Sequence, residues 1–148
     1  MTPDSTVLSQ YLSSLPPVSE PNFLENAKTF LTFASGFDLA DPKIELKLRH
    51  TFHVVDACFY LSQALKLTDE ECYIACLIGL LHDIGRFEQI RRFHSFEPGT
   101  MDHAVFGAEL LFGEEKMIRR FVREDLFDDL INAAIRKHSD FKLEGIHD

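Results

Sequence analysis

The chain has 148 residues, 45% of them hydrophobic, which predicts a folded domain with a core and argues against a disordered chain. Its formal net charge of −9 argues against binding to extended nucleic acid, because an acidic surface repels a phosphate backbone. No stretch reaches the roughly 18 apolar residues of a membrane span and no signal peptide opens the chain, so we expect a cytoplasmic protein without membrane contact.

The first forty residues predict two helices. A short helix is expected over residues 1–15 and ends before Pro16, because two consecutive prolines follow it. A second helix is expected over residues 22–33, where apolar side chains recur at helical spacing until Gly36. We interpret residues 1–40 as an N-terminal helical appendage to a domain over residues 41–148.

A long helix is predicted over residues 42–66. Asp41 and Pro42 are a suitable N-cap and first helical residue. The apolar residues expected near one stripe of this helix are Ile44, Leu48, Phe52, Val55, Phe59 and Ala64.

The next predicted helix covers residues 69–83 and should lie at the centre of the fold. Thr68 and Glu71 have the spacing of a capping box at its start. Residues 73–81 are apolar on nearly every face, which is typical of a buried helix. Its two cysteines are expected to be core residues on one face, with metal binding as the alternative. We expect Gly85 to end the helix.

Three further helices are predicted in the last third of the chain, over residues 102–112, 116–121 and 124–138. Asp102 is the expected N-cap of the first, and Gly113 its stop. The inward residues expected in the last helix are Leu126, Leu130, Ala133 and Ala134. With no strand pattern anywhere, the predicted fold is all-α, a single compact domain of six to eight helices.

The dipeptide His82-Asp83 lies at the end of the most apolar helix. Burial of a carboxylate costs several kcal/mol unless a partner compensates it. A metal cation is one candidate, since the C-terminus of a helix also carries partial negative charge. An arginine, such as Arg49 or Arg86, is an equally suitable partner on these grounds.

His50 supports the metal interpretation. Lys66 lies 16 residues after His50, and His82 lies 13 residues after Asp69. Since short connections make consecutive helices antiparallel neighbours, these similar rises place His50 near the level of His82 and Asp83. His53, three residues later, could support a ligand or simply be exposed.

Four segments together resemble the HD-domain superfamily of metal-dependent phosphohydrolases. They are His50-Thr51 with Val54, the run Leu80-Leu81-His82-Asp83-Ile84-Gly85-Arg86-Phe87-Glu88-Gln89, Asp102-His103-Ala104 with Gly107, and Ala134-Ile135 with His138. The resemblance covers about residues 42–138. It implies an HD-type helical domain, a metal site at His50, His82 and Asp83, and further ligands at His103 and His138 in branches with two ions.

The resemblance implies cleavage of a phosphomonoester or phosphodiester, commonly of a nucleotide, by a metal-activated water. Imidazole ligands favour Mn, Fe, Co, Ni or Zn over Mg, in one or two ions. Asp83 could bridge two ions, and Arg86 could hold the substrate phosphate unless it forms a salt bridge with Asp83 or Glu88.

The family's distal Asp ligand has no match here, since Asp140 and Asp148 lack its context. Either the chain is a shortened form of a longer protein, or the site is incomplete. The alternative function is therefore a non-catalytic metal- or nucleotide-binding regulatory module, and in either case the chain could be an oligomer.

Overall fold

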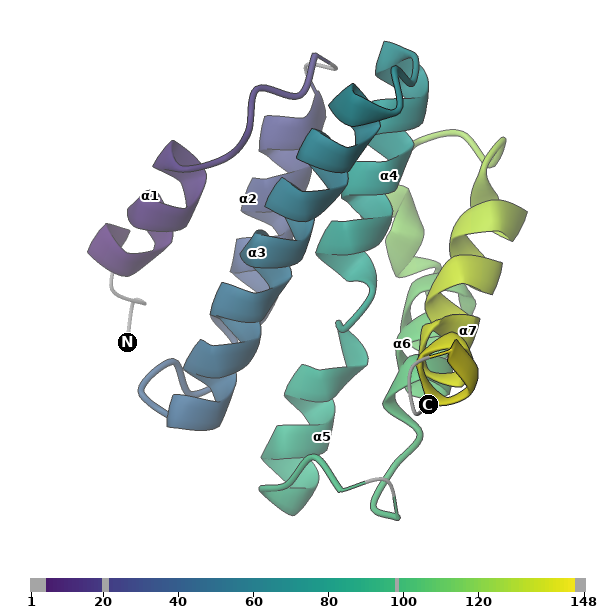
Figure 1. The fold of residues 1–148 in the computed structure, drawn as a ribbon. Helices are drawn as coiled ribbons and strands as arrows, with labels where there is room; N and C mark the ends of the chain where they lie inside the picture. The colour runs from purple at the N-terminus through teal and green to yellow at the C-terminus, as the bar shows by residue number, and fades with distance from the viewer. Residues whose placement is uncertain (1–4, 20–21, 98, 146–148) are drawn as a thin grey trace. The chain divides into compact units, whose positions relative to one another are not determined.

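A computed structural model describes the backbone of residues 5–19, 22–97 and 99–145 and, within these ranges, the side chains of residues 8–138. The described residues form seven α-helices and one 3₁₀-helix and contain no strand (Figure 1). The predicted all-α fold of six to eight helices is thereby confirmed. The contacts divide the chain into two compact units, Met1–Leu80 and Leu81–Asp148. The boundary near residue 40 stays a prediction.

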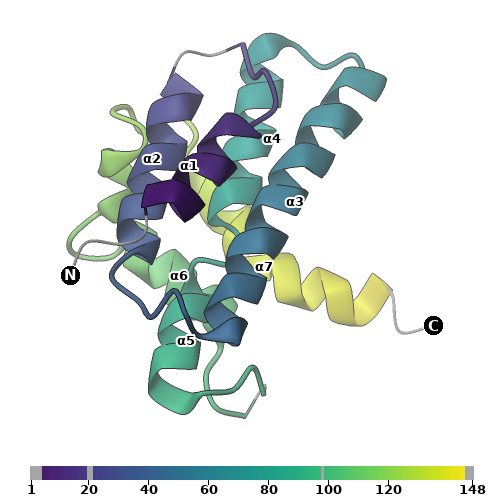
Figure 2. The ribbon, with the colours of Figure 1, turned by 90° about the vertical axis from the view of Figure 1, so that its left-hand side faces the viewer.

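The first unit contains α1 (Ser5–Ser13), α2 (Asn22–Ala34), α3 (Pro42–Ala64) and α4 (Asp69–Leu81), whose last residue opens the second unit. In the two views α2, α3 and α4 run side by side (Figures 1 and 2). Aromatic side chains join them: Phe30 of α2 meets Phe52 of α3 edge-on, with ring centroids 5.9 Å apart. The hydroxyl of Tyr73 in α4 donates a hydrogen bond to Oδ1 of Asn26 in α2.

The long helix α3 begins as its sequence predicts. The side chain of Asp41 accepts a hydrogen bond from the backbone N–H of Lys43 at 2.9 Å, which satisfies a donor that the first turn leaves open. Five of the six expected stripe residues are buried, whereas Ala64 is exposed because it is the last residue of the helix.

The capping box before α4 is also confirmed. The N–H of Thr68 donates to Oε1 of Glu71 at 2.8 Å, and the N–H of Glu71 donates to Oγ1 of Thr68 at 3.1 Å. Residues 76, 77, 80 and 81 are fully buried, and the free cysteines Cys72 and Cys76 are both core residues. The helix ends at Leu81, two residues before the predicted end.

The second unit contains α5 (Gly85–Phe93), α6 (His103–Phe112), the 3₁₀-helix η1 (Met117–Arg120) and α7 (Asp128–Gly145). The prediction that Gly85 ends a helix is wrong, because this residue starts α5, a helix that the sequence pattern did not indicate. An added Cβ at Gly85 would overlap the carbonyl oxygen of His103 and lie 3.0 Å from the N atom of Gly107. Glycine is therefore required by the close approach of α5 and α6.

Helix α7 begins at Asp128, four residues after the predicted start, and presents a different face to the core. Leu126 and Leu130 are 71% and 54% exposed, and Ala133 is exposed as well, so the expected inward stripe is wrong. Ile131 and Ile135, one residue out of phase with it, are fully buried. The β-branched pair at spacing i, i+4 sets the inward face.

No helix among the described residues combines the length and the apolar character that crossing a bilayer requires.

Candidate metal centre

Asp83 belongs to the second unit and lies in the turn directly before α5. Leu81, Ile84 and Phe87 around it are fully buried, so the apolar side chains that anchor the turn also carry the carboxylate inward. Asp83 is 5% exposed. The imidazoles of three histidines of the same unit lie against this buried carboxylate.

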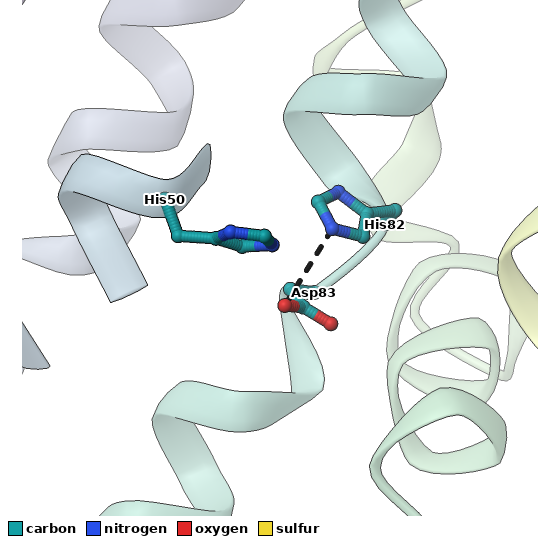
Figure 3. A group of neighbouring side chains, drawn as sticks. All are labelled: His50, His82 and Asp83. Atoms are coloured by element: carbon teal, nitrogen blue, oxygen red, sulfur yellow. Dashed lines mark ion pairs between the residues drawn. The ribbon is translucent and has the colours of Figure 1, made fainter. Parts of the chain in front are cut away.

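The two carboxylate oxygens of Asp83 face different histidines. Oδ1 lies 3.3 Å from Nε2 of His103 and 3.1 Å from Nε2 of His138. Oδ2 lies 3.5 Å from Nε2 of His82, as the dashed line in Figure 3 marks. The two oxygens of the carboxylate therefore face different imidazole nitrogens.

His103 is the first residue of α6, where a helix cap fixes the backbone. Oδ1 of Asp102 accepts a hydrogen bond from the N–H of Val105 at 3.2 Å. Burial lowers the pKa of His103, and the charge of Arg86 lowers it further, against the raising effect of its hydrogen bond to Asp83. The result favours a neutral imidazole, which is the form that binds a metal.

His138 reaches Asp83 from α7, and the backbone fixes its ring. Ile131 and Ile135 anchor the helix in the core. Nδ1 of His138 lies 2.7 Å from the carbonyl oxygen of Ile135, while Nε2 lies 3.1 Å from Nε2 of His103. Because a carbonyl can only accept, Nδ1 must carry the proton of this hydrogen bond.

The proton on Nδ1 of His138 favours a cation between His138 and Asp83. In a neutral His138 with Nδ1 protonated, Nε2 presents a lone pair to Oδ1 of Asp83, which is also an acceptor. Two acceptors at 3.1 Å repel unless His138 is charged or a cation lies between them. A histidine that donates its other N–H to a backbone carbonyl has the arrangement usual for metal ligands.

The spacing of the donor atoms agrees with one coordination sphere. Zn²⁺ binds imidazole nitrogen and carboxylate oxygen at about 2.0–2.2 Å, so neighbouring ligands of one ion lie roughly 3.0–3.5 Å apart. The three separations among Asp83 Oδ1, His103 Nε2 and His138 Nε2 are 3.1, 3.1 and 3.3 Å. These three residues fit a metal ion of that size.

The structure brings together four of the five predicted ligands in the second unit, namely His82, Asp83, His103 and His138. His50, which Figure 3 also draws, is half-buried on α3 in the first unit, and its part in the site stays a prediction. His53 is exposed.

The arginines considered as partners of Asp83 have other contacts. Arg49 pairs with Glu45 at 3.3 Å. Nη1 of Arg86 donates to Oε1 of Gln89 at 2.8 Å. Glu88 binds Arg91 and Arg92, with N to O distances of 2.6 Å. The salt bridges proposed for Arg86 are therefore not what holds it, although the charge of Asp83 acts on its guanidinium.

Two contributors to the site were missed by sequence reasoning. The carbonyl of Ile135 carries no side-chain signal, and only the spacing of three residues before His138 on a helix could have suggested it. Gln89 is fully buried and bonded to Arg86, and its spacing of three residues after Arg86 on a helix was the available signal.

The chain matches one family of known proteins. The family described as HD domain matches residues 48–145, which is about two thirds of the chain. The matched range includes every residue of the predicted site. No curated protein and no solved structure is significantly similar to the chain.

Proposed function

Because the chain belongs to the HD-domain family, we propose that it is a metal-dependent phosphohydrolase that cleaves a phosphomonoester or phosphodiester, with a nucleotide as the substrate. HD domains bind divalent metals, and the superfamily consists in general of metal-dependent hydrolases. The proposal is for a small phosphate ester and not for extended nucleic acid, because the net charge of −9 opposes a long phosphate backbone.

One observation carries the proposal: the buried Oδ1 of Asp83 faces Nε2 of both His103 and His138, and His138 has its proton on the opposite ring nitrogen. If only hydrogen bonds held the cluster together, Oδ1 of Asp83 and Nε2 of a neutral His138 would face each other as two acceptors. A cation would instead bind the lone pairs of Asp83 Oδ1, His103 Nε2 and His138 Nε2 together. Imidazole-rich donor sets favour Mn, Fe, Co, Ni or Zn over Mg.

We assign a separate role to each residue of the proposed site. When bound, the metal would activate a water and neutralise charge on the phosphoryl oxygens. Asp83 orients the site with both oxygens, and its Oδ2 faces His82, so a second ion beside His82 is part of the proposal. His50 is proposed as a further ligand on the strength of its motif. Arg86 is proposed to bind a phosphate oxygen of the substrate.

The experiment is to measure Mn²⁺ binding by calorimetry and phosphate release from p-nitrophenyl phosphate, bis(p-nitrophenyl) phosphate and a nucleoside monophosphate. We expect one or two Mn²⁺ ions to bind per chain. The Asp83→Ala variant should no longer bind the metal, and its turnover should be at least about 100-fold lower. His53→Ala, an exposed histidine, is the control and should behave as the unchanged protein.

Two results would count against the proposal in different ways. Absence of metal binding in the folded, unchanged protein would contradict the metal centre itself. Metal binding without release of phosphate from any of the esters would favour the alternative, a non-catalytic metal- or nucleotide-binding regulatory module.

A further inference from the structure

Gln89 is a fully buried amide in α5, one helical turn after Arg86. Its Oε1 accepts from Nη1 of Arg86 at 2.8 Å. Its Nε2 donates to Oγ1 of Thr100 at 3.0 Å and to the carbonyl oxygen of Glu97 at 3.3 Å. Since burial of an amide is costly without partners, these bonds fix the side chain in one orientation.

The far side of this network is fixed by the backbone. Oγ1 of Thr100 donates to the carbonyl oxygen of Glu97 at 2.7 Å, and the N–H of Thr100 donates to the same oxygen at 3.1 Å. Thr100 therefore presents a hydroxyl of set direction to Gln89.

Arg86 is held on one nitrogen. Nη1 donates to Gln89 and, at 3.2 Å, to the carbonyl oxygen of Phe96, whose ring lies 5.4 Å from the guanidinium carbon. Nε is buried and has no hydrogen-bond partner among the described residues. A buried donor without an acceptor is unfavourable, so it requires an explanation. Nε lies on the edge of the guanidinium with which arginine binds oxyanions in bidentate fashion.

The chemistry of Gln89 also preserves the positive charge of Arg86. A glutamate at this position would form a buried ion pair and neutralise the guanidinium, whereas a neutral amide accepts the hydrogen bond and leaves the charge. The neighbouring carboxylate, Glu88, is already bound by Arg91 and Arg92. The charge of Asp83 acts on the guanidinium of Arg86, but the hydrogen bonds of that guanidinium go to neutral acceptors, so its positive charge is not neutralised by a bound carboxylate among the described residues.

We propose that Gln89, held by Thr100, is a positioning residue that orients Arg86 so that its Nε edge binds an oxygen of the substrate phosphate. This inference rests on the proposed function and adds to it the hydrogen bonds that fix the orientation of the Arg86 guanidinium. The hydrogen bonds of Gln89 among the described residues go to Arg86, Glu97 and Thr100 and not to a candidate ligand, and under this proposal Gln89 does not bind the substrate.

The test uses inorganic phosphate as the probe, titrated by calorimetry into the full chain loaded with Mn²⁺. The variants are Arg86→Ala, Gln89→Met, the double variant, and the pair Thr100→Val and Thr100→Ser. We expect Gln89→Met to weaken phosphate binding about tenfold. In the Arg86→Ala background the same substitution should have almost no effect, because the two residues act as one unit.

The threonine pair tests the same network without altering a fully buried residue. Thr100→Val removes the hydroxyl at nearly constant shape and should weaken phosphate binding several-fold, while Thr100→Ser keeps the hydroxyl and should restore it. Gln10→Met, at an exposed glutamine of α1, is the control for the substitution itself. Affinity for Mn²⁺ should be unchanged in the variants of Gln89, Thr100 and Gln10, because these substitutions remove no charge.

The outcomes separate this inference from the proposed function. If the unchanged chain fails to bind Mn²⁺, the proposed function fails and the inference with it. If Mn²⁺ binds and Thr100→Val binds phosphate as tightly as Thr100→Ser, the inference alone is overturned. It is also overturned if Gln89→Met weakens phosphate binding by the same factor with and without Arg86.

Discussion

The carboxylate of Glu88 in α5 binds two arginines. Burial of the Glu88 carboxyl would raise its pKa, but the hydrogen bonds and charges of Arg91 and Arg92 outweigh it, so the pKa lies below its ordinary value. We therefore expect Glu88→Gln to lower the free energy of unfolding at pH 7 by roughly 0.5–1 kcal/mol, a modest loss because both arginines are half exposed. Urea denaturation measures it.

The pH dependence follows from the direction of that shift. A carboxyl with a lowered folded pKa stabilises the protein above its unfolded value, and this contribution is lost as the pH falls through the folded pKa. The difference between Glu88→Gln and the unchanged protein should thus shrink steadily below about pH 4.5. Glu115→Gln, at an exposed glutamate, is the control. A difference that persists at pH 2 would exclude the ion pairs as its source.

At the level of single residues, the sequence is a better guide to which side chains come together than to which atoms of those side chains carry protons. The carboxylate of Asp83 could be predicted from its place at the end of an apolar helix, whereas His103 and His138 were implied only by the resemblance of their segments to the HD-domain family. The proton on Nδ1 of His138 depends on a carbonyl whose position only the folded helix fixes. Gln89 lies one turn after Arg86 on the same helix, but the contact of Gln89 with Thr100, eleven residues further on, depends on the fold of the intervening loop.

Among the elements, the crossing of α5 and α6 depends on glycine. An added Cβ at Gly85 would overlap the carbonyl oxygen of His103, so Gly85→Ala must displace the start of α6. Because His103 is a candidate ligand, we expect at least about tenfold weaker Mn²⁺ binding, together with a lower Tm.

Gly99→Ala is the matched control for this substitution. An added Cβ at Gly99 meets nothing within 4 Å, so calorimetry and thermal unfolding should match the unchanged protein. If Gly85→Ala lowers the Tm but leaves the affinity for Mn²⁺ unchanged, His103 does not contribute to binding in the way described.

Helix α7 offers a test of which face is inward. Ile135 is fully buried, so Ile135→Ala should cost about 2–4 kcal/mol through the cavity that it leaves. Leu130→Ala, on the exposed face, should change the free energy of unfolding little, because 54% of Leu130 is already in water. Equal losses in the two variants, measured by urea denaturation, would contradict the observed face.

The helices that sequence predicted well are those with explicit end signals. Asp41, Thr68 with Glu71, and Asp102 each make the capping bond that their residue type indicates. The start of α7 has no such signal, and two apolar stripes one residue apart compete there, so packing decides between them. Helix α5 was missed because Gly85 is typical of a helix end, and its real reason, a close approach to α6, is a tertiary contact.

For the whole molecule, the net charge of −9 affects how an ion reaches the site. A negatively charged protein attracts a divalent cation over distances up to the Debye length, which is about 30 Å at 0.01 M salt and about 8 Å at 0.15 M. We therefore expect the affinity for Mn²⁺ to fall about two- to fivefold when NaCl is raised between these concentrations. Titration calorimetry at the two salt concentrations measures the change.

Two controls distinguish long-range attraction from the ligands themselves. Sucrose at matched osmolality should leave the affinity unchanged, because it does not screen charge. Replacement of the exposed Glu114 and Glu115 by glutamine removes two negative charges from the surface without touching a candidate ligand, and should reduce the salt dependence. If the affinity for Mn²⁺ is the same at both salt concentrations, the binding free energy comes from the ligand atoms alone. The acidic surface then acts only against large polyanions.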